Sequence, residues 1–142
     1  MSDDLPFEFL DTNILVYAFD RSAGVKNEKA AALVADLWKS RRGCLSVQVL
    51  QEFYVVGTRK LPHIPRSELR AILHDLSQWR IHMPSAADVL DAAYLHERAQ
   101  VSFWDAMILQ SAITLGCRIV WSEDLNAGQR FESMHLLNPF LS

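Results

Sequence analysis

The chain has 142 residues, of which 50% are hydrophobic, and carries a formal net charge of −3. This length fits a single domain with a substantial core, so residues 1–142 are expected to form one domain. No apolar run reaches the roughly 18 residues of a membrane span, and the N-terminus, Met1 to Pro6, is acidic where a signal peptide is basic. These features predict a cytoplasmic protein with no membrane partner. The negative net charge argues against a protein that binds nucleic acid through its overall charge.

Short apolar runs with the character of strands alternate with longer segments of helical periodicity. The strands expected in chain order are Phe7 to Leu10, Gly43 to Ser46, Arg80 to Met83, Arg118 to Trp121 and His135 to Leu137. The helices expected between them begin near Asn13, cover Lys26 to Arg41 and Val47 to Thr58, run from about Pro65 to Ser77 and from Ser85 to near Arg98, and start again after Ser102. This alternation predicts an α/β sandwich with a mostly parallel sheet.

The cysteines and histidines form no zinc-binding pattern. Cys44 and Cys117 each lie beside a strand-like run and are expected to be reduced core residues. The five histidines form no i, i+4 pair and no cluster with cysteine. The sequence therefore supports neither a zinc protease nor a zinc finger.

Four acidic residues stand in apolar surroundings at the junctions of these elements: Asp11, Glu52, Asp105 and Asp124. No Lys or Arg lies between Leu45 and Val56 or between Val101 and Cys117, so the nearby sequence supplies no cation to pair with Glu52 or Asp105. Because ionised acids are almost never buried without a partner, each of the four requires an explanation.

Three of these acids have a local structural explanation as well. Asp11 could cap the helix that follows it, Asp105 has capping-box spacing from Ser102, and Asp124 lies in a polar loop. Glu52 has none, because it lies in mid-helix between Leu50 and Phe53.

A shared site is the alternative to separate local roles. Ligands of open α/β sheets bind beyond the carboxyl ends of the strands, and all four acids can reach that edge. A cluster of carboxylates without His or Cys suits a hard cation, Mg²⁺ or Mn²⁺. Trp104, beside Asp105, could stack on RNA bases, but its helical spacing to Ile108 favours a place in the core.

The sequence resembles the PIN-domain family, and within it the VapC-type toxins of toxin-antitoxin operons. The resemblance extends from Phe9 to Phe140 and rests on four segments in the family's order, which are Asp11 to Ala18, Ser46 to Phe53, Ser102 to Ala106 and Ser122 to Leu125. It implies a three-layer α/β/α sandwich with a four- or five-stranded, mostly parallel sheet. One departure is Asn126, where relatives often carry a further acid, and Glu123 could compete with Asp124.

The resemblance implies a Mg²⁺- or Mn²⁺-dependent endoribonuclease in which metal-activated water hydrolyses RNA phosphodiester bonds. Carried over by position, the catalytic and metal-binding residues are Asp11, Glu52, Asp105 and Asp124, with Asn13, Thr12 and Ser46 in support. Basic residues that could line one face are Arg41, Arg42, Arg59, Lys60, Arg66 and Arg70.

The resemblance also implies partners: an RNA substrate such as a transfer or ribosomal RNA loop, a cognate antitoxin in a groove near the active site, and a second copy of the chain in a homodimer. Apolar residues beyond the needs of one small core could form that groove, namely Leu33, Leu37, Phe53, Tyr54 and Val56. The alternative is a catalytically silent PIN-like module that binds RNA or protein.

Overall fold

The computed structural model describes residues 5–125 and 128–141, and its centre is one β-sheet. The strands are β1 (Phe7–Leu10), β2 (Gly43–Ser46), β3 (Arg80–His82), β4 (Cys117–Trp121), β5 (Arg130–Phe131) and β6 (Met134–Leu137). Their order across the sheet is β3-β2-β1-β4-β6-β5, and every neighbouring pair is parallel except β5 with β6.

All five predicted strands are present, with shifts of one residue at an end in three of them. The strand that was not predicted is β5, two residues long, which pairs antiparallel with β6 at the sheet edge. A two-residue strand has no apolar periodicity that a sequence can display. The sheet is therefore mostly parallel, as predicted, with one short antiparallel edge.

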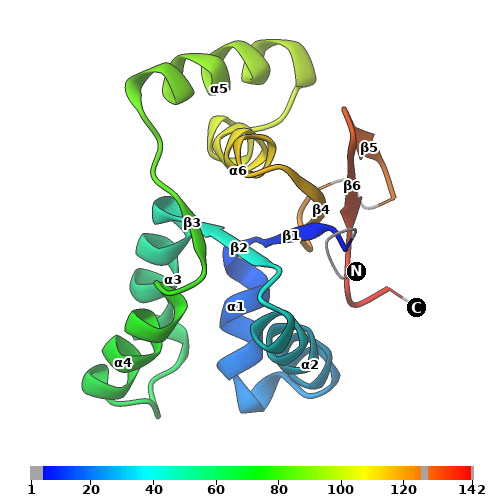
Figure 1. Ribbon diagram of the computed structural model, residues 1–142. Coiled ribbons are helices and arrows are strands. Elements are labelled where there is room, and N and C mark those ends of the chain that lie inside the picture. The colour runs from blue at the N-terminus through cyan, green and yellow to red at the C-terminus, as the bar shows by residue number, and fades with distance from the viewer. Residues whose placement is uncertain (1–4, 126–127, 142) are drawn as a thin grey trace.

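Helices cover both faces of the sheet, which confirms the three-layer architecture. On one face lie α1 (Thr12–Phe19), α2 (Val25–Ser40), α3 (Val47–Lys60) and α4 (Arg66–Leu76), with the short 3-10 helix η2 (Arg21–Ala23) joining the first two. On the other face lie α5 (Ala86–Ala99) and α6 (Phe103–Thr114) (Figure 1). Within the described ranges, no helix has the length and apolarity needed to cross a membrane.

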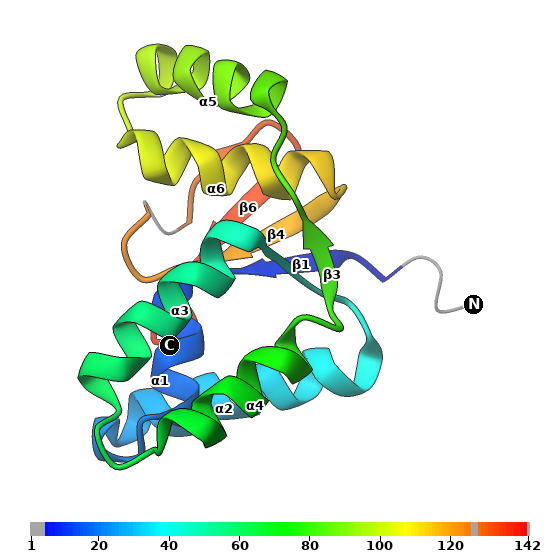
Figure 2. The same cartoon turned by 90° about the vertical axis from the view of Figure 1, so that its left-hand side faces the viewer.

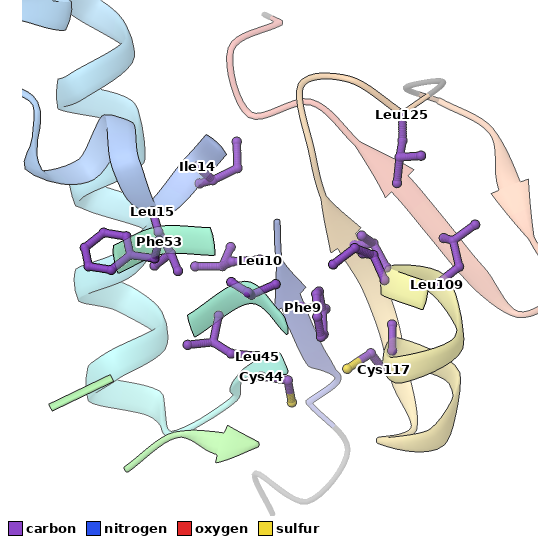
Figure 3. Close-up of a cluster of buried hydrophobic side chains, with 14 of the residues drawn as sticks. Phe9, Leu10, Ile14, Leu15, Cys44, Leu45, Phe53, Leu109, Cys117 and Leu125 are labelled. Atoms are coloured by element: carbon purple, nitrogen blue, oxygen red, sulfur yellow. The ribbon is translucent and has the colours of Figure 1, made fainter. Parts of the chain in front are cut away.

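The core lies on both sides of the central strand β1. Phe9 and Leu10 are both fully buried and point to opposite sides of β1, Phe9 toward α6 and Leu10 toward α1 and α3 (Figure 3). A parallel strand covered on both faces has no solvent side, so its apolar residues need not alternate with polar ones. Cys44 and Cys117 are free and buried in this core, as predicted.

Two residues assigned to a surplus apolar surface belong to the core instead. Leu37 of α2 and Phe53 of α3 are 1% and 0% exposed, and Phe53 packs edge-on against Phe19. Leu33, Tyr54 and Val56 are partly buried and pack against the same core. The sequence could not separate the two groups because residues four apart on a helix share a face whether that face meets the sheet or solvent.

Candidate active site

The four predicted acids meet at one cavity, about 450 Å³ in volume. Asp11, Glu52, Asp105 and Asp124 all line it, together with Thr12, Asn13, Gln48, Gln51, Val55, Val56, Arg59, Trp104 and Ile108. These residues come from α1, α3, α6 and the segment after β4, elements far apart in sequence. The site therefore lies beyond the carboxyl ends of the parallel strands β1 and β4, as expected for an open α/β sheet.

Asp11 is the most enclosed of these acids, with 8% of its surface exposed. Its Oδ1 accepts a hydrogen bond from the Thr12 backbone N–H at 2.7 Å, and its Oδ2 accepts one from the Ser122 hydroxyl at 2.8 Å. The helix-capping role is therefore real, and it coexists with a place in the cavity. Burial, with a contribution from the Asp105 and Glu52 carboxylates, raises the pKa of Asp11 from 3.8 to about 6.

Ser122 is a supporting residue that the sequence did not single out. Its hydroxyl donates to Asp11 and accepts hydrogen bonds from the backbone N–H groups of Asp124 and Leu125, so it ties two parts of the site together. Strand register explains the contact: Leu10 lies opposite Trp121, which brings the next residues of both strands side by side. In the sequence, the available signal was a hydroxyl residue that directly follows a predicted strand and lies shortly before a candidate acid.

Glu52 is held by a residue from another helix. The Thr12 hydroxyl donates to Glu52 Oε1 at 2.9 Å, which joins α1 to α3 at the rim of the cavity. Ser46 does not line the cavity; its hydroxyl accepts from the Val49 backbone N–H at 3.2 Å and caps α3. Its support for the site is therefore indirect, because it fixes where the helix carrying Glu52 begins.

The local explanation of Asp105 is only half right. The Ser102 hydroxyl does accept from the Asp105 backbone N–H at 3.0 Å. Among the described residues, the reciprocal bond from the Ser102 backbone N–H to the Asp105 carboxylate is not formed, whereas Ser85 and Asp88 at the start of α5 form both bonds of a capping box. The Asp105 carboxylate is therefore free of a capping bond and faces the cavity that it lines.

Asp124 and its neighbour Glu123 separate into different surroundings. The Asn13 side chain donates to Asp124 Oδ2 within the cavity, so the structure brings these two predicted site residues together. Glu123 accepts from the Tyr17 hydroxyl at 3.0 Å and pairs with Lys26, and it does not line the cavity. Glu123 therefore does not compete with Asp124, while Asn126 lies outside the described residues.

Trp104 is not a core residue, which corrects the interpretation of its helical spacing. It is 62% exposed and lines the cavity beside Asp105, with its ring edge-on to Phe103. The Gln48 side chain donates to its backbone carbonyl at 3.4 Å. Trp104 lies in the first turn of α6, and its side chain faces the cavity and solvent instead of the core.

Among the residues that the structure describes, Arg59 is the one cationic side chain that lines the cavity. It lies on α3 seven residues, or about two helical turns, after Glu52. The sequence offered Arg59 only as one of six basic residues, because periodicity alone does not place its side chain at this rim.

The donor set of the cavity fits a hard divalent cation. Its acids are all carboxylates, and neither His nor Cys lines it. The raised pKa of Asp11 reflects burial and neighbouring negative charge, both of which a cation would offset. In residues 5–125 and 128–141, however, no three His, Cys, Asp or Glu side chains are placed to hold one metal ion together, so the fit is one of chemistry.

The comparisons with known proteins identify the family of the chain. A family model of the PIN domain matches residues 9–130. The chain belongs to the PIN-domain family. No curated protein matches this PIN domain in sequence.

Solved structures resemble this PIN domain in fold at low sequence identity. A toxin-antitoxin complex from Klebsiella pneumoniae aligns with a TM-score of 0.69 and 16% identity, covering 94% of this chain and 98% of that one. VapBC2 from Rickettsia felis, bound to a DNA fragment from its promoter, aligns at 0.65 and 20%, covering 93% and 98%. Mycobacterium tuberculosis VapC20, a toxin that cleaves the sarcin-ricin loop, aligns at 0.60 and 21%, covering 80% and 86%.

Proposed function

We propose that this PIN domain is a Mg²⁺- or Mn²⁺-dependent endoribonuclease and the toxin of a toxin-antitoxin pair. The observation that carries the proposal is the convergence of Asp11, Glu52, Asp105 and Asp124 on one cavity that also holds Arg59. Four acids from four segments, with little opposite charge near them, destabilise the folded state unless a cation binds between them.

Asp11, Asp105 and Asp124 would hold the cation, and Glu52 would bind it or orient the attacking water. When bound, the divalent cation supplies a water of lowered pKa and positive charge against the phosphate oxygens. The hydrogen bonds from Thr12 and Ser122 keep the Asp11 carboxylate fixed in its rotamer, and the Thr12 hydroxyl does the same for Glu52.

The remaining residues of the cavity suit the handling of RNA. Arg59 is placed to contact a phosphate oxygen, and the exposed Trp104 ring can stack on an unpaired base. Water attacks phosphorus and the bond to the 3′-oxygen breaks, so the products are a 5′-phosphate and a 3′-hydroxyl. A transfer or ribosomal RNA loop is the proposed substrate, which is supported by the similarity to a toxin that cleaves the sarcin-ricin loop.

The proposed partners are an antitoxin and a second copy of the chain. Similarity to solved toxin-antitoxin complexes supports the antitoxin. A largely apolar groove of about 680 Å³ lies between α3 and α4 and adjoins the catalytic cavity, since Gln51 and Val55 line both. Tyr54, Leu50 and Leu73 also line it, so it suits an apolar segment of the antitoxin.

The test is cleavage of total cellular RNA by purified protein in Mg²⁺ or Mn²⁺, beside Asp11→Asn and an EDTA control, with the product ends mapped. Discrete cuts that carry 5′-phosphates and vanish in the variant are expected. The matched control Asp91→Asn changes an exposed acid of α5 and should cut normally. Absence of cuts by protein free of any copurified partner would favour the silent RNA- or protein-binding module.

A further inference from the structure

A second cavity lies at the opposite edge of the sheet from the acids. It has a volume of about 590 Å³ and is lined by Leu37, Trp38, Lys39, Arg41, Gly43, Gln78, Trp79 and Arg80. Gly43 and Arg80 are the first residues of β2 and β3, whereas the catalytic cavity lies past the last residues of β1 and β4. Figure 2 shows the C-terminal ends of α2 and α4 near the start of β3, where this cavity forms.

Two tryptophans form an aromatic wall in this cavity. The Trp38 and Trp79 rings meet edge to face, with centroids 5.8 Å apart and planes at 78°. Trp79 packs directly on Gly43, where an added Cβ would fall 2.3 Å from the ring. Trp79 is thereby fixed against the sheet, while Trp38 remains 44% exposed and offers its ring to a ligand.

The charge of this second cavity is positive, although the whole chain is negative. Lys39, Arg41 and Arg80 line it, and no Asp or Glu does so among the described residues. Arg80 is held in place over the Phe7 ring and donates to the Leu115 carbonyl. Two helix C-termini contribute only about half a negative charge each, so the cavity retains a net positive field.

Arg41 occupies a backbone conformation that costs the fold energy. Its φ is 60° and its ψ 27°, the left-handed region, at the residue that ends α2. Glycine is the usual residue there because it has no Cβ to clash, and Arg pays for the conformation. Gln100 ends α5 in the same left-handed conformation without lining this cavity, so the strain at Arg41 marks a position where glycine would suit the backbone better.

We propose that this second cavity binds one nucleotide of single-stranded RNA, at a site distinct from the point of cleavage. The base stacks on Trp38, and the flanking phosphate is contacted by Lys39 and Arg41. A cavity of this size accepts one nucleotide, and an aromatic face combined with cations is the pattern that holds unpaired RNA. The inference rests on the proposed function only in taking RNA as the ligand.

The first experiment follows the indole N–H signals of the four tryptophans by NMR while a single-stranded RNA of six adenosines is added in EDTA. Trp38 and Trp79 report on the second cavity, and Trp104 reports on the catalytic one. Saturable shifts of the Trp38 and Trp79 signals are expected. Trp38→Ala should raise the Kd of this RNA roughly tenfold, since it removes the stacking face.

Arg41→Gly is the variant that separates binding from folding, because glycine suits the left-handed backbone. It should weaken RNA binding and reduce the slope of log affinity against log salt by about 0.7, the loss of one phosphate contact. Gln100→Gly is the backbone control, since Gln100 ends α5 with a φ of 54°. Arg66→Gln is the charge control, at the other end of α4.

Three outcomes would overturn the inference. Shifts confined to Trp104 would show that RNA enters only the catalytic cavity. Equal weakening by Arg41→Gly and Arg66→Gln would show attraction by charge in general. Equal affinity for inorganic phosphate would show an anion site with no role for the base. In each case, metal-dependent cleavage of RNA would still test the proposed function separately. If RNA shifted the Trp38 signal of the parent chain but the parent chain did not cleave RNA, that result would count against the proposed function alone.

Discussion

Asp11 connects the backbone of one strand to the chemistry of the whole site. Its carboxylate caps α1 and also accepts the Ser122 hydroxyl, so capping and site formation use the two oxygens of one side chain. The two roles do not conflict, because each carboxylate oxygen can accept more than one bond. A residue explained by local structure is therefore not excluded from catalysis.

The raised pKa of Asp11 predicts how the stability of the metal-free protein depends on pH. Its value is 3.8 in the unfolded chain and about 6 in the folded one, so the folded state holds a proton that the unfolded state releases. As pH rises through these values the free energy of unfolding should fall by about 3 kcal/mol in total, and the dependence ends once the pH is well above the folded pKa.

Asp11→Asn should lack this pH dependence. The free energy of unfolding of the variant minus that of the parent chain should therefore be larger at pH 8 than at pH 4. Urea unfolding in EDTA at both pH values measures the difference. The Ser122 hydroxyl favours the ionised form of Asp11, and this preference is already included in the shifted pKa. A gap between variant and parent that does not change with pH would contradict the prediction, and Asp91→Asn serves as the exposed control.

Thr12→Val tests whether the hydroxyl that holds Glu52 matters for catalysis. Valine matches threonine in shape, and Thr12 is 6% exposed, so the variant should fold while losing the bond to Glu52. For the proposed nuclease we expect the rate of RNA cleavage to fall roughly tenfold, which is the size of effect typical of a residue that orients a metal-site carboxylate. Thr12→Ser keeps a hydroxyl and should retain most activity; an equal loss in both variants would rule out this role.

At the scale of elements, two glycines show how differently the same residue can serve the fold. At Gly43 in β2, an added Cβ would lie 2.3 Å from the Trp79 ring, which packs between strand and helix. At Gly57 in α3, the nearest atoms are 3.1 and 3.2 Å away and belong to the flexible end of Leu69. Only Gly43 is required by close packing against a rigid ring.

Gly43→Ala should destabilise the protein by about 1–3 kcal/mol, because Trp79 must move to admit the methyl group. Gly57→Ala should be near neutral, since the helix preference for alanine, about 1 kcal/mol, offsets a small shift of Leu69. Urea unfolding of both variants at one pH compares them. Equal effects would mean that Trp79 adapts as easily as Leu69.

At the scale of the molecule, the parallel sheet gathers four distant acids at one edge and basic residues with aromatics at the other. Parallel strands all end at the same edge, so residues that follow them are brought together whatever their separation in sequence. Because negative charge is concentrated at that edge, the stability of the fold should be sensitive to a cation bound there.

Mn²⁺ should raise the midpoint of thermal unfolding of the parent chain, because a ligand of the folded state adds about 1.4 kcal/mol at ten times its Kd. KCl at equal ionic strength is the control for simple screening. Asp105→Asn should lose most of the increase, since it removes one carboxylate from the cavity. A rise of the same size in KCl would leave no need for a metal site.

The sequence by itself determined the fold class and the five main strands, and it singled out the four acids that line one cavity. These depend on local information: apolar runs of strand length, caps such as Ser85, and carboxylates placed where no nearby Lys or Arg can pair with them. Elements that bury an apolar face can be predicted from sequence, because burial dictates which residue types occupy that face.

Only the tertiary structure decided which side chains share a space. The contact of Ser122 with Asp11 follows from the register of β1 with β4. The exposure of Trp104 and the position of Arg59 follow from how the start of α6 and the last turn of α3 are placed around the cavity. The cavity lined by Trp38 and Trp79 brings together α2 and the turn before β3, which are separate in sequence. These relations are set by packing between elements, and periodicity within one element carries no information about them.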